Sequence, residues 1–228
     1  MNSKLEVIAS LVTTKSIIDI GCDHGYLDIY LTKKGIKCLA TDISYKAIKC
    51  AINNFKKNNL DIDYMVTDGL NNIDIKKSDT IIISGMGTDT IINILNKEIT
   101  NDLIISSNNH LEKLRRYIVS MNYYIDKEIF IIENNKPYVI IKFKYGKKDY
   151  SDYDYILGIN YDKDYLDYIK GKYINILNKI PDKYKDKINY YNNLISEIEK
   201  DTVKKYLFLC RKLLQNVIYG FNYIRYIL

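Results

Sequence analysis

The chain has 228 residues, 47% of them hydrophobic, which is long enough for one well-buried domain, alone or with a smaller appendage. Its formal net charge of +6 is not concentrated in a basic tail, so charge alone gives only weak support for a nucleic-acid partner. The four cysteines form no C-x-x-C pair, which argues against a disulfide scaffold and predicts reduced thiols that bind no metal. The N-terminus lacks a signal-peptide core, so we expect a cytoplasmic protein.

Short β-branched runs alternate with longer helical patterns between residues 16 and 145. Strands are predicted at Ser16–Ile20, Lys37–Thr41, Ile62–Val66, Thr80–Ser84, Asp102–Ser106, Ile125–Ile132 and Tyr138–Tyr145. Helices are predicted at Tyr26–Lys34, Tyr45–Asn58, Asp89–Lys97 and Leu111–Met121. Repeated strand–helix units predict an α/β fold with a parallel sheet covered on both faces. A turn-rich connection at residues 133–137 joins the last two strands as a hairpin, so we expect a seven-stranded, mostly parallel, Rossmann-like sheet typical of class I methyltransferases.

The sequence changes in character near residue 150. Residues 149–161 are rich in Tyr, Asp and Gly and are interpreted as a linker. Apolar residues then recur every three or four positions on both sides of Pro181, which predicts a coiled-coil-like hairpin of two helices. We therefore expect a domain of residues 1–149 and a helical domain of residues 150–228; two helices lying on the sheet as a lid are the alternative. The apolar stretch 206–228 contains three basic residues, which argues against a membrane span.

The sequence DIGCDHG, from Asp19 to Gly25, follows the first predicted strand. A dinucleotide fingerprint G-x-G-x-x-G beginning at Gly21 would need glycine where Asp23 and Tyr26 stand, which disfavours a nicotinamide cofactor. The S-adenosylmethionine pattern, acidic-x-G-x-G-x-G, fits with Asp23 in place of the middle glycine. Gly21 and Gly25 allow the backbone to approach a cofactor closely. We expect Asp23 to receive the amino group of that cofactor.

Two further acceptors stand at the ends of the next two strands. Asp42 follows the second strand, at the distance expected for a ribose-binding carboxylate. Asp68 and Gly69 follow the third strand and suit an adenine amino group. Each has an ordinary alternative: Asp42 as the N-cap of the next helix, Asp68-Gly69 as a turn, and the loop glycines as plain turn residues. We expect the cofactor pocket to include also Cys22, Ile43, Gly85, Met86 and Gly87.

The segment after the fourth strand, SGMGT, lacks the D/N-P-P-Y/F motif of enzymes that methylate exocyclic amino groups. The elements GCDHGYL and SGMGTDTI, the Asn108 region with Arg115 downstream, and the two-helix extension resemble the bacterial tRNA adenine-22 N1-methyltransferase family (TrmK) over nearly the whole chain. The resemblance implies methyl transfer from S-adenosylmethionine to N1 of adenine 22 in tRNA. Three positions depart from the family pattern: Asp42 replaces Glu, Ser107 stands where Pro precedes Asn108, and Asp28 replaces Pro.

Adenine N1 already carries a lone pair, so the reaction needs placement more than a strong base. The base must be turned out of its stack and held. We expect Tyr26 to stack on it, Asn108 to contact its edge, and His24 to orient it or accept a proton. Ordinary packing is the alternative for Tyr26, and a capping or core position is the alternative for His24.

A large RNA should also contact basic residues outside the pocket. The candidates are Arg115, Arg116, Lys142, Lys144, Lys147 and Lys148, with the lysines of the C-terminal hairpin as a second arm. A solvated surface is the default interpretation of such a run. We expect a monomer with tRNA as its partner and no membrane association.

Three other functions are alternatives to tRNA methylation. A methyltransferase that acts on a small molecule or a protein is the nearest alternative, and it would need a lid and little basic surface. A non-catalytic RNA-binding protein that keeps the cofactor fold belongs to a different class. A Rossmann oxidoreductase is already disfavoured by Asp23 and Tyr26.

Overall fold

The computed structural model describes residues 3–107, 109–159 and 162–200. The chain divides into two compact units, Met1–Asn160 and Tyr161–Leu228. The strands of the first unit are β1 Ser16–Ile20, β2 Lys37–Asp42, β3 Asp63–Val66, β4 Thr80–Met86, β5 Asp102–Ser107, β6 Tyr123–Glu133 and β7 Lys136–Tyr145. Its helices are α1 Lys4–Leu11, α2 Tyr26–Thr32, α3 Tyr45–Lys57, α4 Thr88–Ile94, α5 Leu111–Ser120 and α6 Asp152–Leu157, with a 3₁₀ turn, η1, at Ile75–Lys77.

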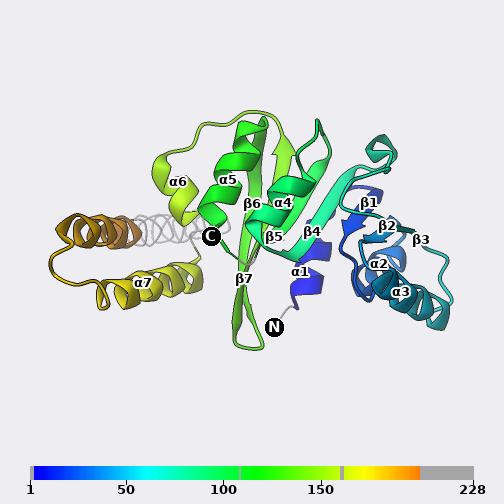
Figure 1. The fold of residues 1–228 in the computed structure, drawn as a ribbon, viewed down its shortest axis with the longest axis horizontal. Coiled ribbons are helices and arrows are strands. Elements are labelled where there is room, and N and C mark those ends of the chain that lie inside the picture. The colour runs from blue at the N-terminus through cyan, green and yellow to red at the C-terminus, as the bar shows by residue number, and fades with distance from the viewer. Residues whose placement is uncertain (1–2, 108, 160–161, 201–228) are drawn as a thin grey trace, which may run out of the picture. The chain divides into compact units, whose positions relative to one another are not determined.

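The seven strands form one sheet in the order β3-β2-β1-β4-β5-β7-β6 (Figure 1). β1 pairs in parallel with both β2 and β4, whereas β7 runs antiparallel to β5 and β6. The predicted fold class, a mostly parallel seven-stranded sheet that ends in an antiparallel hairpin, is confirmed. In the central strand β4, Ile81, Ile82 and Ile83 are all 0% exposed, which explains why its sequence is continuously apolar rather than alternating.

The chain direction across the sheet reverses between β1 and β4. The chain passes from β1 to β2 and β3 on one side, and from β4 to β5 on the other. Right-handed crossovers therefore place α2 and α3 on one face of the sheet and α4 on the opposite face. Helix contacts agree: α2 contacts α1 and α3, and α5 contacts α4 and α6. The reversal point is where open α/β sheets bind their ligands.

Two helices of the first unit were not predicted. α1 precedes the sheet and begins with a capping box in which Ser3 and Glu6 cap each other. α6 lies within the predicted linker 149–161, so that prediction is wrong for residues 152–157. A second capping box, Ser151 with Asp154, starts α6. The proposed boundary at 149/150 stays a prediction, and the compact units divide at 160/161.

The second unit contains the predicted helical hairpin. α7 spans Lys163–Leu177, and residues 185–200 form a second helix after the turn at Pro181. The rings of Tyr173 and Tyr191 lie 5.5 Å apart between centroids, and Lys170 pairs with Glu199 at 2.6 Å, so the two helices are antiparallel. Among the described residues, no helix is both long and apolar enough to cross a bilayer. The apolar stretch 206–228 lies outside the described residues.

Candidate functional site

The loop from Gly21 to Gly25 is folded tightly against the end of β2. The backbone amides of Gly21 and Cys22 both donate to the carbonyl of Thr41, at 2.8 and 2.9 Å, and the amide of Gly25 donates to the Cys22 carbonyl at 2.8 Å. Gly25 has φ +69°, and a Cβ there would lie 2.4 Å from Phe55 Cε1. Because both its conformation and the space around it demand glycine, a plain turn does not account for Gly25.

Asp42 is fixed by this loop at the end of β2. Its Oδ2 accepts from the amide of Asp23 at 3.3 Å, and its Oδ1 accepts from the amide of Ser44 at 2.8 Å. The N-cap of α3 is Ser44, so the alternative in which Asp42 caps that helix is wrong. A carboxylate has about four lone-pair sites, which leaves acceptor capacity for the hydroxyls of a ribose.

The end of β3 lies beside the end of β2. The amide of Thr67 donates to the Asp42 carbonyl at 2.9 Å, which brings the exposed Asp68 to the same edge of the sheet as Asp42. Gly69 has φ +57° and closes a turn against Ile94. Ile43 is 70% exposed and is available to cover a flat ligand.

The end of β4 contacts the loop after β1. Met86, the last residue of β4, has its Cε 2.4 Å from the position that a Cβ on Gly21 would occupy, so the end of the strand meets this loop. Thr88, at the start of α4, connects to the segment after β5: its amide donates to Asn109 Oδ1 at 2.9 Å, and its hydroxyl donates to the Asn109 carbonyl at 2.6 Å. Neither Thr88 nor Asn109 was predicted as a site residue, because their hydrogen bonds join segments that only the tertiary fold brings together.

Tyr26 and His24 stand at the open side of this edge. Tyr26 is 59% exposed and His24 has a half-exposed side chain, with ring centroids 5.7 Å apart. The N-cap of α2 is Gly25 without a side-chain cap, so His24 occupies neither the core nor a capping position. Both rings are available to contact a planar base. Asn108, the third predicted catalytic residue, lies outside the described residues.

Asp19 and Asp28 form a buried acidic pair beneath the loop. Asp19 is 5% exposed and Asp28 is fully buried. The carboxyl of Asp28 lies within hydrogen-bonding reach of Asp19, and two buried carboxyl groups this close are stabilised when one of them is protonated and donates to the other. Burial, with the charge of Asp42 adding to it, raises the pKa of Asp19 to about 7, and burial beside Asp19 raises the pKa of Asp28. One proton therefore stays on the pair near neutral pH.

Two predicted RNA-binding residues are buried instead. Arg115 is 0% exposed and forms an ion pair with the equally buried Glu128. Its Nη1 also donates to the carbonyl of Tyr155 at 2.9 Å, which fixes α6 to α5. Lys142 is 3% exposed, and its Nζ donates to the carbonyl of Leu11 at 2.9 Å. The prediction that Arg115 and Lys142 contact RNA is wrong, because these cations hold parts of the fold together.

The other predicted RNA-binding residues are on the surface. Arg116 pairs with Glu112 and Asp152, and Lys144 pairs with Asp126 at 3.9 Å. Lys147 and Lys148 are exposed. They follow the end of β7, and because β7 is antiparallel to β5, they lie at the edge of the sheet opposite the cofactor loops.

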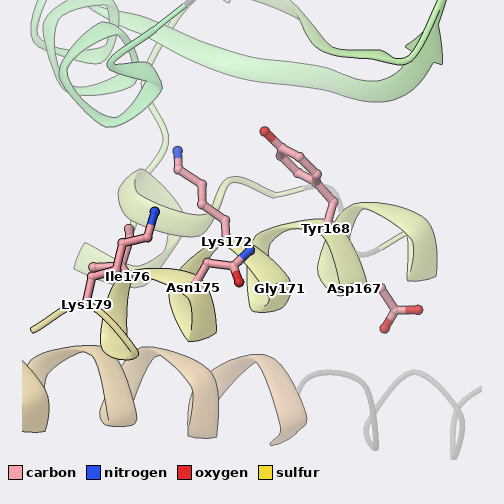
Figure 2. Close-up of a pocket in the computed structure, with 7 residues that line it drawn as sticks. All are labelled: Asp167, Tyr168, Gly171, Lys172, Asn175, Ile176 and Lys179. Atoms are coloured by element: carbon pink, nitrogen blue, oxygen red, sulfur yellow. The ribbon is translucent and has the colours of Figure 1, made fainter.

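A groove on α7 carries polar and aromatic side chains (Figure 2). Tyr168 and Lys172 point to the same side of the helix, whereas Asp167 points away and pairs with Lys163. The groove is lined by Asp167, Tyr168, Gly171, Lys172, Asn175, Ile176 and Lys179. Within the described residues, no cluster of His, Cys, Asp and Glu could hold a metal ion.

Comparisons with known proteins agree with this geometry. A family model described as a methyltransferase domain matches residues 1–141. The Mycoplasma genitalium protein "Putative tRNA methyltransferase MG248" is 31% identical over 159 residues, which cover 66% of this chain and 72% of that protein. The crystal structure of Streptococcus pneumoniae Sp1610, "a putative tRNA (m1A22) methyltransferase", has a TM-score of 0.79 at 25% identity and covers 89% of this chain and 100% of that chain. The structure of M. capricolum TrmK with S-adenosyl-homocysteine has a TM-score of 0.75 at 29% identity and covers 88% of this chain and 96% of that chain.

Proposed function

Because the chain belongs to the family of methyltransferase domains, we propose that it transfers a methyl group from S-adenosylmethionine to N1 of adenine 22 in tRNA. The observation that supports this most strongly is the set of glycine and aspartate loops at three neighbouring strand ends, in a chain that resembles TrmK over 88% of its length. The proposed substrate is a cytoplasmic RNA, so we expect the protein to act in the cytoplasm.

The residues at this edge fit the proposed cofactor. The loop from Gly21 to Gly25 leaves room for close approach, and the fixed carboxylate of Asp42 offers acceptors for ribose hydroxyls. Asp68 would receive the adenine amino group, with Ile43 against the ring. S-adenosylmethionine, when bound, supplies an electrophilic methyl group on a sulfonium sulfur.

Positioning is the main task that the protein performs on the target base. Adenine N1 attacks with its own lone pair, and the product carries the positive charge, so no proton has to leave the ring in this step. Tyr26 would stack on the extruded base, and His24, 5.7 Å from it between ring centroids, would limit how the base can rotate. A near-attack geometry set in this way can supply most of the rate enhancement.

RNA contacts outside the pocket would involve exposed cations. Tyr168 and Lys172 of α7, and Lys179 just after its end, line one groove, and an aromatic ring followed by two cations suits both bases and phosphates. Lys147 and Lys148 lie at the far edge of the sheet, so they would contact only parts of the RNA remote from the methylated base. Replacing any phosphate-contacting lysine should reduce the salt dependence of tRNA binding.

The class of substrate can be tested with labelled S-adenosylmethionine and three acceptor mixtures: unmodified tRNA, tRNA-free protein and low-molecular-weight metabolites. The proposal predicts label in the tRNA fraction. Label only in protein or metabolites would instead support the alternative methyltransferase, and cofactor binding without any transfer would support a non-catalytic RNA-binding protein.

A further inference from the structure

The unpredicted helix α1 is fixed at both ends to the sheet. Its apolar residues Val7, Ile8 and Leu11 are buried, and the carbonyl of Leu11 accepts from the buried Lys142 Nζ. At the other end, the backbone amide of Lys4 donates to Glu133 Oε1 at 3.1 Å, at the end of β6. The first residue of α1, Lys4, is therefore held in a defined position.

That position is the carboxyl edge of the sheet. The Nζ of Lys4 lies 3.8 Å from the point that a Cβ on Gly85 would occupy, near the carboxyl end of β4. It also lies 4.9 Å from the centroid of the Tyr138 ring, and Asp19 of β1 is close enough to interact with it electrostatically. The ammonium group thus stands at the ends of β1 and β4, where the chain direction reverses.

The charge of this ammonium group is poorly compensated in the protein. In the described part of the chain, no carboxylate lies within ion-pair distance of Lys4 Nζ, and no acceptor hydrogen-bonds to it. Lys4 is partly buried, and this burial lowers its pKa, although Glu133 and Asp19 oppose the shift. A partly desolvated cation of this kind is stabilised when an anionic ligand binds beside it.

We propose that Lys4 binds the carboxylate of the amino-acid portion of the S-adenosylmethionine cofactor. The inference rests on the proposed function and assigns a positioning residue that lies outside the glycine and aspartate motifs. The cofactor has two cationic groups, an ammonium and a sulfonium, and the exposed carboxylate of Asp23 in the first loop is suited to the ammonium. Its single carboxylate requires a cation, and Lys4 supplies one near the carboxyl end of β4.

An RNA phosphate is the competing ligand for Lys4, and the geometry favours the cofactor. Phosphates of a folded RNA reach exposed side chains at the rim of a site, whereas Lys4 is partly buried, with its ammonium group near Gly85 and over the face of Tyr138. Lys136, at the turn of the β6–β7 hairpin, is exposed and serves as a control for a general loss of positive charge.

The test is calorimetric binding of two ligands to the full chain: S-adenosylhomocysteine, and S-adenosyl-3-thiopropylamine, which lacks only the carboxylate. Lys4→Met should weaken S-adenosylhomocysteine binding by about 10- to 100-fold, because a charge-assisted contact is lost. The same substitution should change the affinity for S-adenosyl-3-thiopropylamine by less than about 2-fold. Lys4→Arg should restore most of the S-adenosylhomocysteine affinity, and Lys136→Met should leave both affinities unchanged.

Three results would overturn the inference. Lys4→Met could bind S-adenosylhomocysteine as tightly as the original protein; it could lose both ligands equally, together with a lower thermal unfolding temperature; or it could keep both ligands and lose only tRNA affinity. If the unsubstituted protein fails to bind S-adenosylhomocysteine, the proposed function fails as well. If it binds the ligand and methylates tRNA while Lys4→Met behaves normally, only this inference fails.

Discussion

Replacing Arg115 by Met should unfold the first unit far more readily than replacing its neighbour Arg116. The side chains of Arg115 and Glu128 are both 0% exposed, so Arg115→Met leaves the Glu128 carboxylate buried without its cation. Removing one member of a buried pair costs about 3–5 kcal/mol. For a unit of this size, each kcal/mol lowers the unfolding temperature by about 2–4 °C, which predicts a drop of roughly 6–20 °C. The carbonyl of Tyr155 also loses its charged donor, so α6 should detach first.

Thermal and urea unfolding, followed by circular dichroism, measure this effect. Arg116→Met is the matched control, because the side chain of Arg116 is 41% exposed and its surface ion pairs should contribute about 0–1 kcal/mol. The double variant Arg115→Met/Glu128→Met removes both charges and should recover much of the lost stability. If Arg115→Met unfolds like Arg116→Met but binds tRNA more weakly, Arg115 contacts RNA and the structural role assigned to it is wrong.

Three further predictions concern the loop and the target base. The pKa of Asp19 is raised to about 7 and the pKa of Asp28 is raised as well, so the folded protein holds more protons than the unfolded chain above about pH 4. Wild-type stability therefore falls as the pH rises from about 4 through 7. Asp28→Asn should therefore gain unfolding temperature relative to wild type between pH 5 and pH 8, and a difference that shrinks with pH would contradict the shared proton. Gly25→Ala should lower the free energy of unfolding in urea by about 2 kcal/mol or more. Gly35 has a similar φ of +80° but nothing within 4 Å of an added Cβ, so Gly35→Ala should lower it by only about 1 kcal/mol. Equal losses would show that the steric contact at Gly25 is unimportant. Tyr26→Ala should lower kcat/KM for tRNA about 10-fold or more with unchanged S-adenosylhomocysteine affinity, and Tyr26→Phe should keep most activity; a Phe variant as weak as Ala would exclude stacking as the role of Tyr26.

Most of the sheet could be predicted from the sequence because its strands are buried on both faces. β1 was predicted with its observed bounds, Ser16–Ile20, and a continuous apolar run such as Ile81–Ile83 has few other interpretations. The short helices were harder. α6 has six residues and an acidic, Tyr-rich sequence, so its apolar pattern is too brief to detect, and only the capping box at Ser151 marked its start.

The site was predictable where chemistry follows directly from a motif and unpredictable where it depends on tertiary contacts. Gly25 and Asp42 lie in loops whose sequence spacing indicates their place at the strand ends. Whether a basic residue is exposed is not encoded locally. The residues next to Arg115 and Lys142 in the sequence do not distinguish these two cations from exposed ones. Their burial follows from tertiary contacts: Arg115 pairs with Glu128, and Lys142 donates to the carbonyl of Leu11 at the end of α1. Lys4 belongs to a helix that contains no recognised motif, and only the tertiary fold places it near Gly85.

The most direct measurement is methyl transfer to two unmodified tRNA transcripts that differ only at position 22, one with adenosine and one with guanosine, followed by nucleoside analysis. The proposed function predicts 1-methyladenosine from the A22 transcript and no product from the G22 transcript. Equal labelling of both transcripts, or N6-methyladenosine as the product, would contradict it.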